Sequence, residues 1–365
     1  MNTQLLIDTA NKLFADHKGL LAMDESNPTC NKRFAKLNIP ETVESRRAYR
    51  ELILTTPGLG ESISGVILYD ETIRQHKKDG TPFLKVLIDV GIIPGIKVDA
   101  GAKDLAAYPG EKITEGLDGL RERLKEYFQR GARFAKWRAV IAIGEGIPTR
   151  SCIEANAHAL ARYAALCQEA GLVPIVEPEV LMDGGHTLER CRAVTEEVLR
   201  NVFIQLNCQR VLLEGMILKP NMVLPGLTCP PHQEVKEVDI GEQQYQVRLT
   251  DRQPEEEQDI DEVANITVKS LWRTIPAAVP GIAFLSGGQS AELASARLNV
   301  MNLRFKSQLP WALSFSFARA IQQPALEIWR GQEANVKAAQ QALLHRTKCN
   351  RAARRGEYTA AMERA

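Results

Sequence analysis

The stretch VLLEGMILKPNM, residues 211–222, is an apolar run that ends on a single lysine. Pro220 follows Lys219 directly and interrupts a strand, because proline has no N–H to donate to a neighbouring strand. A lysine at the end of a buried strand is costly unless its ammonium has a partner or a function. A desolvated lysine has a lowered pKa, and its free amine can attack a carbonyl carbon to form a Schiff base. The alternative is that Lys219 extends into solvent.

The composition excludes several classes of protein. The chain has 365 residues, of which 44% are apolar and 25% charged, so it is long enough for one large α/β barrel or two ordinary domains. A formal net charge of +1 argues against bulk attraction to nucleic acid or membrane. Seven cysteines without a C-x-x-C pair indicate free thiols in a reducing compartment. With neither a signal-peptide pattern nor a membrane-spanning apolar stretch, we expect a cytoplasmic protein without nucleic-acid or membrane partners.

Apolar runs alternate with amphipathic helical segments along the chain, and no linker divides it. Strands are expected at residues 20–24, 63–69, 92–99, 134–143, 172–179, 211–219, 282–286 and 310–316. Helices are expected at residues 4–14, 46–55, 114–130, 151–170 with a capping box at Ser151, 187–208, 260–273 and 290–302, and from about 324 and about 334.

Seven or eight strand–helix repeats without a G-x-G-x-x-G fingerprint favour a closed (β/α)8 TIM barrel over a doubly wound sheet. We therefore predict an α/β fold in which residues 1–365 form a single barrel domain. The polar segment 230–259 is expected to be an extra loop or a small hairpin, and residues from about 345 to 365 a helical C-terminal tail.

Charged residues stand at the ends of these predicted strands, where a barrel of this kind assembles its active site. They are Asp24, Lys97, Lys136 with Arg138, Glu177 with Glu179, and Lys219. Because side chains alternate along a strand, Lys136 and Arg138 share one face, as do Glu177 and Glu179. Any one of these residues could be a rim residue in a salt bridge. Their convergence on one rim predicts a polar pocket.

Such a pocket suits amine catalysis. Lys136 is expected to hold Lys219 neutral by like-charge repulsion. Glu177 could protonate the hydroxyl that leaves when a carbinolamine dehydrates. Asp24 could take a proton from a substrate hydroxyl as a carbon–carbon bond breaks, with the electrons flowing into the protonated imine.

The last two strands are followed by residues suited to an anion. In FLSGGQS, residues 284–290, Gly287 and Gly288 let backbone amides approach an anion beside the Ser286 hydroxyl, although the same motif is also typical of a tight turn. Ser316 and Arg319 follow the eighth strand, and the loops after strands seven and eight are the usual phosphate site of this barrel. At the other end of the pocket, a second anion could contact Ser26, Thr29, Lys32, Arg33 and Lys97, unless these form only a solvated basic helix start.

Taken in order, these motifs resemble the class I (Schiff-base) fructose-bisphosphate aldolases from Gly19 to about Tyr358. They are LLAMDES, RRAYRELILTT, GVILYDET, GIKVD, LDGLRERL with FAKWR, ARYAALCQEAGLVPIVEPE, LEGMILKPNMV, GIAFLSGGQS and PWALSFSFARA. The resemblance implies reversible cleavage of fructose 1,6-bisphosphate to dihydroxyacetone phosphate and glyceraldehyde 3-phosphate. It also implies a homotetramer that needs no metal or other cofactor, because a covalent imine with Lys219 is the electron sink.

The resemblance also implies a role for each site residue. Lys219 would form the imine with C2, Glu177 would be its acid/base with help from Lys136, and Asp24 would deprotonate the C4 hydroxyl. Glu179 would tune the charges beside Lys219. The C1 phosphate would contact Ser286, Gly287, Gly288, Ser316 and Arg319; the C6 phosphate side would be formed by Arg33, Ser26, Thr29, Lys97 and Arg138.

The chain departs from the family pattern near both phosphate sites and at its end. Ala318 replaces a glycine before Arg319, and Asn27-Pro28-Thr29 replaces Thr-Gly-Ser. The C-terminal tyrosine of the eukaryotic members is missing, and Tyr358 is followed by only seven residues. We expect carbon–carbon chemistry to be retained while another base or water exchanges the enamine proton. In that case a Tyr358→Phe change leaves C3-proton exchange of dihydroxyacetone phosphate nearly intact, whereas a large loss would give Tyr358 the role.

Three alternatives have different consequences. The same chemistry could act mainly on sedoheptulose 1,7-bisphosphate, because the far phosphate site need only accept one more carbon. A non-catalytic scaffold would be expected to have lost Lys219, Glu177, Asp24 or Lys136, and all four are present. An aldolase for sugars with one phosphate or none would lack a phosphate site.

Overall fold

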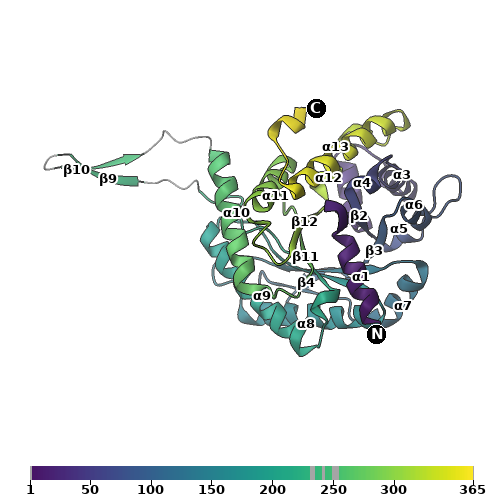
Figure 1. The fold of residues 1–365 in the computed structure, drawn as a ribbon, viewed down its shortest axis with the longest axis horizontal. Coiled ribbons are helices and arrows are strands. Elements are labelled where there is room, and N and C mark those ends of the chain that lie inside the picture. The colour runs from purple at the N-terminus through teal and green to yellow at the C-terminus, as the bar shows by residue number, and fades with distance from the viewer. Residues whose placement is uncertain (1, 231–234, 241–242, 249–254, 365) are drawn as a thin grey trace.

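The apolar runs form eight parallel strands that close into a barrel in the computed structural model, which describes residues 2–230, 235–240, 243–248 and 255–364 (Figure 1). The order around the barrel is β1-β12-β11-β8-β7-β6-β3-β2. The barrel strands are β1 (Gly19–Ala22), β2 (Ile63–Leu68), β3 (Ile93–Lys97), β6 (Phe134–Ile141), β7 (Val173–Val180), β8 (Ile217–Leu218), β11 (Gly281–Phe284) and β12 (Ala312–Phe317). The predicted (β/α)8 fold is confirmed.

Helices surround the barrel, as Figure 1 shows. The α-helices are α1 (Thr3–Leu13), α2 (Asn27–Ala35), α3 (Val43–Leu54), α4 (Leu59–Ser62), α5 (Asp70–Ile73), α6 (Phe83–Asp89), α7 (Leu120–Arg130), α8 (Arg150–Glu169), α9 (Leu188–Cys208), α10 (Glu255–Thr274), α11 (Ala291–Phe305), α12 (Arg319–Trp329) and α13 (Val336–Arg355). The 3₁₀ turns in the described part of the chain are η1 (Ala15–His17), η2 (Leu213–Gly215), η3 (Glu333–Asn335) and η4 (Ala360–Arg364).

Helix α1 closes one end of the barrel with apolar side chains. Leu6, Leu13 and Phe14 pack with Phe134 and other residues of the barrel interior in one buried cluster. Barrel glycines leave room for these large side chains: a Cβ at Gly281 would lie 2.4 Å from the Phe14 ring. This end therefore has no space for a polar ligand.

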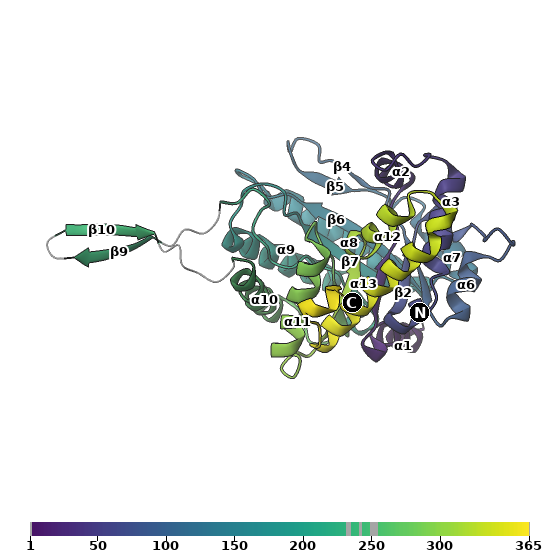
Figure 2. The same ribbon diagram turned by 90° about the horizontal axis from the view of Figure 1, so that it is seen from above.

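The opposite end is open and carries polar side chains. Figure 2 shows α1 on one side of the barrel, and α2 with the hairpin β4 (Ala102–Asp104) and β5 (Lys112–Thr114) on the other. The strands run parallel, so their carboxyl ends all meet at this second end. The loops that follow the strands can therefore build one pocket there.

The helix predicted for residues 114–130 starts too early. Residues 112–114 belong to β5, and the helix begins only at Leu120. Gly116 and Gly119 between them have φ of 124° and 65°, a backbone conformation that interrupts a right-handed helix. The Thr114 hydroxyl donates to the Arg138 carbonyl at 2.8 Å, which ties this short strand to β6.

Other helix starts also differ from the prediction, and α3 begins at Val43 rather than at residue 46. Helix α8 is capped by Thr149, whose hydroxyl accepts from the Cys152 N–H at 3.3 Å, while the Ser151 hydroxyl bonds to Tyr108 at 2.9 Å. Helix α12 begins at Arg319 and continues through Pro324, which was expected to start it. The sequence identifies an N-cap or a first-turn proline only from its immediate neighbours. In α8 and α12 another residue, Thr149 or Arg319, occupies the helix start.

The segment 230–259 contains a hairpin rather than an irregular loop. Strands β9 (Val235–Ile240) and β10 (Gln243–Arg248) pair antiparallel, with Gln243 opposite Ile240. Helix α10 starts at Glu255, so the excursion is shorter than predicted. Residues 231–234, 241–242 and 249–254 lie outside the described part of the chain.

Candidate active site

Lys219 lies immediately after β8, at the open end of the barrel. The strand predicted for residues 211–219 shortens to Ile217–Leu218, because residues 213–215 form the 3₁₀ turn η2 and Pro220 has no N–H. Hydrogen bonds to the neighbouring segments still hold the backbone of Lys219 and Pro220. The Lys219 N–H donates to the Val176 carbonyl at 2.8 Å, and the Pro220 carbonyl accepts from Leu285 at 3.1 Å. Lys219 is thereby fixed between β7 and β11, and only 3% of its surface is exposed.

Four buried charged side chains form a continuous chain of ion pairs. The Lys219 Nζ lies 3.0 Å from Glu177 Oε1. The Lys136 Nζ lies 2.7 Å from Glu177 Oε2 and 3.0 Å from Asp24 Oδ2. Each of the four is less than 10% exposed. Residues from β6, β7, the end of β8 and the loop after β1 thus meet at one point, although they are far apart in sequence.

A cavity of about 880 Å³ opens above this cluster. Every site residue predicted from the sequence lines it except Gly288 and Lys32. The lining residues are Asp24, Ser26, Thr29, Arg33, Lys97, Lys136, Arg138, Glu177, Glu179, Lys219, Ser286, Gly287, Ser316 and Arg319, together with Ala22, Glu25, Lys36, Leu37, Asp99, Gly101, Ala102, Val140, Leu285, Ala318, Gln323 and Glu327. Gly288 lies next to the lining: a Cβ there would be 3.6 Å from an Arg319 nitrogen.

Burial is the largest cause that lowers the pKa of Lys219, to about 8. Asp24 and Glu179 oppose the shift, and Arg138 is the cation that adds to it. The expected like-charge repulsion by Lys136 is therefore not the leading cause, because the Lys136 ammonium is itself paired with Asp24 and Glu177. Burial also lowers the pKa of Lys136 to about 8, against the pull of Asp24.

The Asp24 carboxylate stays ionised in this cluster. Burial alone would raise its pKa, but the ammonium groups of Lys136 and Lys219 outweigh burial and hold the pKa below its ordinary value. Asp24 is thus available as a proton acceptor at neutral pH, although the neighbouring cations make it a weak base.

One end of the cavity offers donors without internal partners. Among the described residues the buried Ser316 hydroxyl has no hydrogen-bond partner, and Arg319 has no ion-pair partner. Gly287 and Gly288 have φ of 59° and 98°, in the left-handed region that favours glycine. Ala318 has φ of −107°, so its position does not require the glycine that the family has there. These groups can donate hydrogen bonds to an anion.

At the other end three cations already have a carboxylate. Arg33 pairs with Glu25 at 2.6 Å, and Lys97 pairs with Asp99 at 2.6 Å. Arg138 pairs with Glu179. The sequence interpretation missed the roles of Glu25 and Asp99, although both stand in quoted motifs, beside Asp24 and two residues after Lys97. The Ser26 and Thr29 hydroxyls lie 3.0 Å apart on the same side.

Tyr358 does not line the cavity. Its hydroxyl donates to Glu363 Oε1 at 2.7 Å, its own N–H donates to Asn299 at 2.9 Å, and the residue is 8% exposed. In this arrangement its hydroxyl bonds to Glu363 and lies outside the cavity that contains the Lys219 cluster. The expectation that another group exchanges the enamine proton stays a prediction.

Comparison with known proteins gives the family. A family model described as fructose-bisphosphate aldolase class-I matches residues 5–248 and 246–365. The chain belongs to this family. It is therefore a fructose-bisphosphate aldolase of class I, a lyase, and its substrates are sugar phosphates. The family is metal-independent and uses Schiff-base chemistry.

Similar proteins cover almost the whole aldolase chain. It is 54% identical over 359 residues to a probable fructose-bisphosphate aldolase class 1 of Xanthomonas campestris, which covers 98% of this chain and 99% of that one. It is 50% identical to the cytosolic fructose-bisphosphate aldolase 6 of Arabidopsis thaliana, over 97% and 91% of the two chains. The solved aldolase of Plasmodium falciparum, in complex with TRAP and a small-molecule inhibitor, superposes with a TM-score of 0.88 at 45% identity, over 98% and 96%. Among the described residues no helix has the length and apolar character needed to cross a membrane.

Proposed function

We propose that Lys219 is the residue that forms the Schiff base when this aldolase cleaves fructose 1,6-bisphosphate. The observation that carries the proposal is the contact between the buried Lys219 Nζ and Glu177 Oε1, 3.0 Å apart, at the edge of the cavity. Four buried charges contribute little to stability, because desolvation offsets the attraction between them. Such a cluster beside a cavity is typical of a catalytic site.

Imine formation uses the Lys219–Glu177–Lys136 part of the cluster. Glu177 first takes a proton from the Lys219 ammonium, 3.0 Å away, and the neutral amine then attacks C2 of the ketose and forms a carbinolamine. Glu177 delivers a proton to the departing hydroxyl, so water leaves and a protonated imine forms. Lys136 lies 2.7 Å from the other Glu177 oxygen and orients this carboxyl group.

Cleavage uses Asp24. Its carboxylate takes the proton of the C4 hydroxyl, the C3–C4 bond breaks, and the electron pair moves into the protonated imine to give an enamine. The C4 fragment leaves as glyceraldehyde 3-phosphate. Protonation of the enamine at C3 and hydrolysis of the imine then release dihydroxyacetone phosphate and regenerate Lys219. Glu179, paired with Arg138, raises the pKa of Lys219 and so offsets part of the lowering by burial.

The two ends of the cavity hold the two phosphates. The C1 phosphate contacts the Ser286 and Ser316 hydroxyls, the Gly287 and Gly288 amides and Arg319. Within the described part of the chain the Ser316 hydroxyl has no hydrogen-bond partner and Arg319 has no ion-pair partner. The C6 phosphate lies on the side of Ser26, Thr29, Arg33, Lys97 and Arg138. The existing pairs with Glu25, Asp99 and Glu179 weaken the attraction there, so we propose that the C1 end contributes more to binding.

The rate of imine formation is expected to depend on pH through Lys219. Its pKa is lowered to about 8, so the amine is mostly protonated at pH 7 and mostly free at pH 9. The initial rate of borohydride trapping with dihydroxyacetone phosphate should rise about tenfold per unit below pH 8 and level off above it. The phosphate is already ionised over this range, because its second pKa is about 6. A flat rate between pH 7 and 9 would contradict the proposed free amine.

Arg319 and Arg33 are expected to act on different substrates. Arg319→Met removes a charge-assisted hydrogen bond to the C1 phosphate, and should raise KM about 10- to 100-fold for both fructose 1,6-bisphosphate and fructose 1-phosphate. Arg33→Met should raise KM only for the bisphosphate, and by less, because Arg33 is already paired with Glu25. Steady-state kinetics with both sugars measures this. The assignment of the two ends is reversed if Arg33→Met affects fructose 1-phosphate and Arg319→Met does not.

The remaining parts of the proposal rest on the family and its relatives. We propose that cleavage by this chain needs no metal or other cofactor, that residues 1–365 act as one domain, and that the enzyme is a cytoplasmic homotetramer without nucleic-acid or membrane partners. The cytosolic relative in Arabidopsis supports the compartment. Light scattering of the full chain measures the oligomeric state, and a monomer would contradict it. Activity in excess chelator tests cofactor independence.

A further inference from the structure

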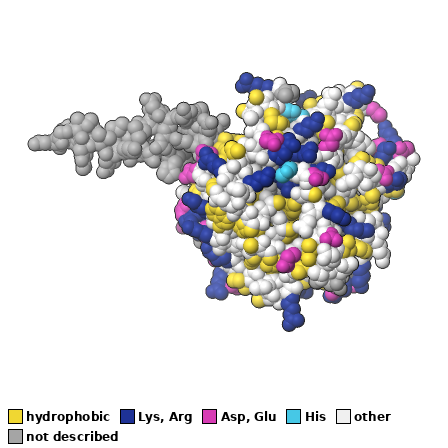
Figure 3. Space-filling model, viewed as in Figure 1, with side chains coloured by type: hydrophobic (Ala, Val, Ile, Leu, Met, Phe, Trp, Pro, Cys, Tyr) yellow, Lys and Arg dark blue, Asp and Glu magenta, His cyan; other side chains and the backbone are white. Residues whose placement is uncertain are grey.

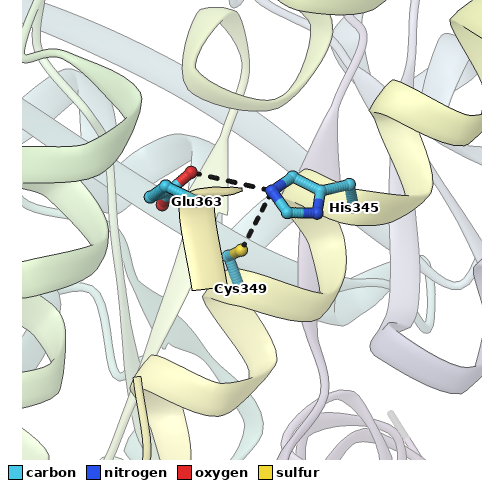
Figure 4. A group of neighbouring side chains, drawn as sticks. All are labelled: His345, Cys349 and Glu363. Atoms are coloured by element: carbon cyan, nitrogen blue, oxygen red, sulfur yellow. Dashed lines mark hydrogen bonds and ion pairs between the residues drawn. The ribbon is translucent and has the colours of Figure 1, made fainter. Parts of the chain in front are cut away.

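Three side chains of different chemistry meet at the C-terminal end of the chain, outside the cavity. His345 and Cys349 are four residues apart on α13 and therefore lie on the same face of that helix. Glu363 reaches them from the 3₁₀ turn η4. In Figure 4 the His345 ring nitrogen points at both the Cys349 sulfur and the Glu363 carboxylate. None of the three lines the active-site cavity.

The distances match those between ligands of a tetrahedral metal ion. His345 Nε2 lies 3.6 Å from Cys349 Sγ and 3.7 Å from Glu363 Oε2, and the three ligand atoms all lie within 4.8 Å of one another. Zinc bonds of about 2.0–2.3 Å at tetrahedral angles place neighbouring ligand atoms about 3.4–3.6 Å apart. The separation between His345 and Glu363 is too long for a direct hydrogen bond, for which 2.7–3.2 Å is usual for nitrogen and oxygen.

A second layer of contacts orients the carboxylate. Glu363 Oε1 accepts from the Tyr358 hydroxyl at 2.7 Å, and Oε2 accepts from Arg346. Each carboxylate oxygen has two acceptor positions, so Oε2 can keep the Arg346 bond and still ligate an ion. Hydrogen-bonded carboxylates of this kind are typical of metal sites. Arg346 is itself held by the Ala291 carbonyl and the Ser295 hydroxyl, both at 2.9 Å.

An ion can reach these ligands from solvent. The His345 side chain is 31% exposed and that of Glu363 19%, whereas Cys349 is buried beneath them. Figure 3 shows Lys and Arg side chains gathered over the C-terminal helices, with histidine side chains among them. The fourth position of a tetrahedral ion would therefore face water.

We propose that His345, Cys349 and Glu363 form a zinc-class divalent metal site that joins the C-terminal turn η4 to α13. A thiolate, an imidazole and a carboxylate are the ligands that Zn²⁺ prefers, and they do not suit Mg²⁺ or Ca²⁺. Binding replaces the S–H bond of Cys349 by a sulfur–metal bond and releases that proton to solvent, with no change of oxidation state. The site is structural, because it lies outside the cavity and imine chemistry needs no metal.

Co²⁺ is the probe that tests this proposal. In a phosphine reductant, titration of the full chain should give strong visible d–d bands of four-coordinate Co²⁺ and a thiolate-to-cobalt charge-transfer band, saturating at one ion per chain. Zn²⁺ should displace both. Bound Zn²⁺ should also raise the unfolding temperature as its concentration increases. If one equivalent of Co²⁺ gives no more than the weak spectrum of the six-coordinate ion, the proposal is overturned.

Variants decide which ligands are responsible. Cys349→Ser should abolish the charge-transfer band, and His345→Gln and Glu363→Gln should each weaken Co²⁺ binding at least about 10-fold. His345→Gln keeps the test valid if Cys349→Ser misfolds, because the His345 side chain is partly exposed and its replacement should leave the fold intact. The matched control is Cys208→Ser, which changes the exposed cysteine and should leave the spectrum intact. A band that survives in Cys349→Ser and disappears in Cys208→Ser would overturn the proposal. Trapping at Lys219 should be the same in all four variants.

Discussion

Lys219→Met is expected to reduce the rate of fructose 1,6-bisphosphate cleavage by on the order of 10⁴-fold or more, because the variant has no amine to form the imine and no electron sink for the C3–C4 bond. Borohydride reduction with dihydroxyacetone phosphate should add one triose phosphate to the native chain and none to the variant. Mass spectrometry of the digested protein should place the adduct on Lys219.

Lys136→Met and Lys125→Met are the controls for this result. Lys136 lies in the same cluster, so its removal should slow catalysis but leave any trapped adduct on Lys219. Lys125 is exposed on α7 and its removal should change neither rate nor adduct. The Lys219 variant should fold, since Glu177 keeps its pair with Lys136. An adduct on Lys136, or substantial activity in Lys219→Met, would assign the imine to another lysine.

Asp24→Asn is expected to separate the two halves of the reaction. Cleavage should slow by on the order of 10²- to 10⁴-fold, because the amide cannot accept the C4 hydroxyl proton. Trapping of dihydroxyacetone phosphate should persist, since that substrate has no C4 hydroxyl. Asp24 raises the pKa of Lys219, so its neutralisation should leave more free amine at pH 7 and trapping should be faster, not slower.

Glu179→Gln is the matched control for Asp24→Asn. Glu179 also raises the pKa of Lys219, but its ion pair is with Arg138, whereas Lys136 pairs with Asp24 and Glu177. It should therefore reproduce the faster trapping with a much smaller loss of cleavage. If trapping and cleavage fall together in Asp24→Asn, Asp24 acts in imine formation or in folding rather than in proton transfer from the C4 hydroxyl.

The repeat of apolar runs was sufficient to predict the barrel, and the barrel was sufficient to predict where the charged strand ends would meet. Parallel strands bring their carboxyl ends to one rim, so Glu177 and Lys219 had to lie near each other once β7 and β8 were neighbours. Alternation along β7 also put Glu177 and Glu179 on one face. These conclusions depend only on periodicity, which a single chain displays directly.

Local sequence patterns gave wrong helix and strand boundaries where a residue far away in the sequence makes a competing contact. Ser151 has the pattern of an N-cap, but its hydroxyl bonds to Tyr108, and Thr149 caps α8 instead. The strand before Lys219 was overestimated because its apolar residues also suit the turn η2. Propensity cannot distinguish such outcomes, because the competing contact comes from elsewhere in the fold.

The sequence by itself determined the order of the eight barrel strands, the lysine at the end of the sixth of them, and the residue types around the cavity. Only the tertiary structure decided how the charges pair: Lys136 between Asp24 and Glu177, and Arg33, Lys97 and Arg138 each with a carboxylate. It also decided that burial, more than Lys136, lowers the pKa of Lys219. The reason is physical: periodicity is a property of neighbouring residues, whereas burial and ion pairing depend on distances of a few ångströms between residues far apart in the chain.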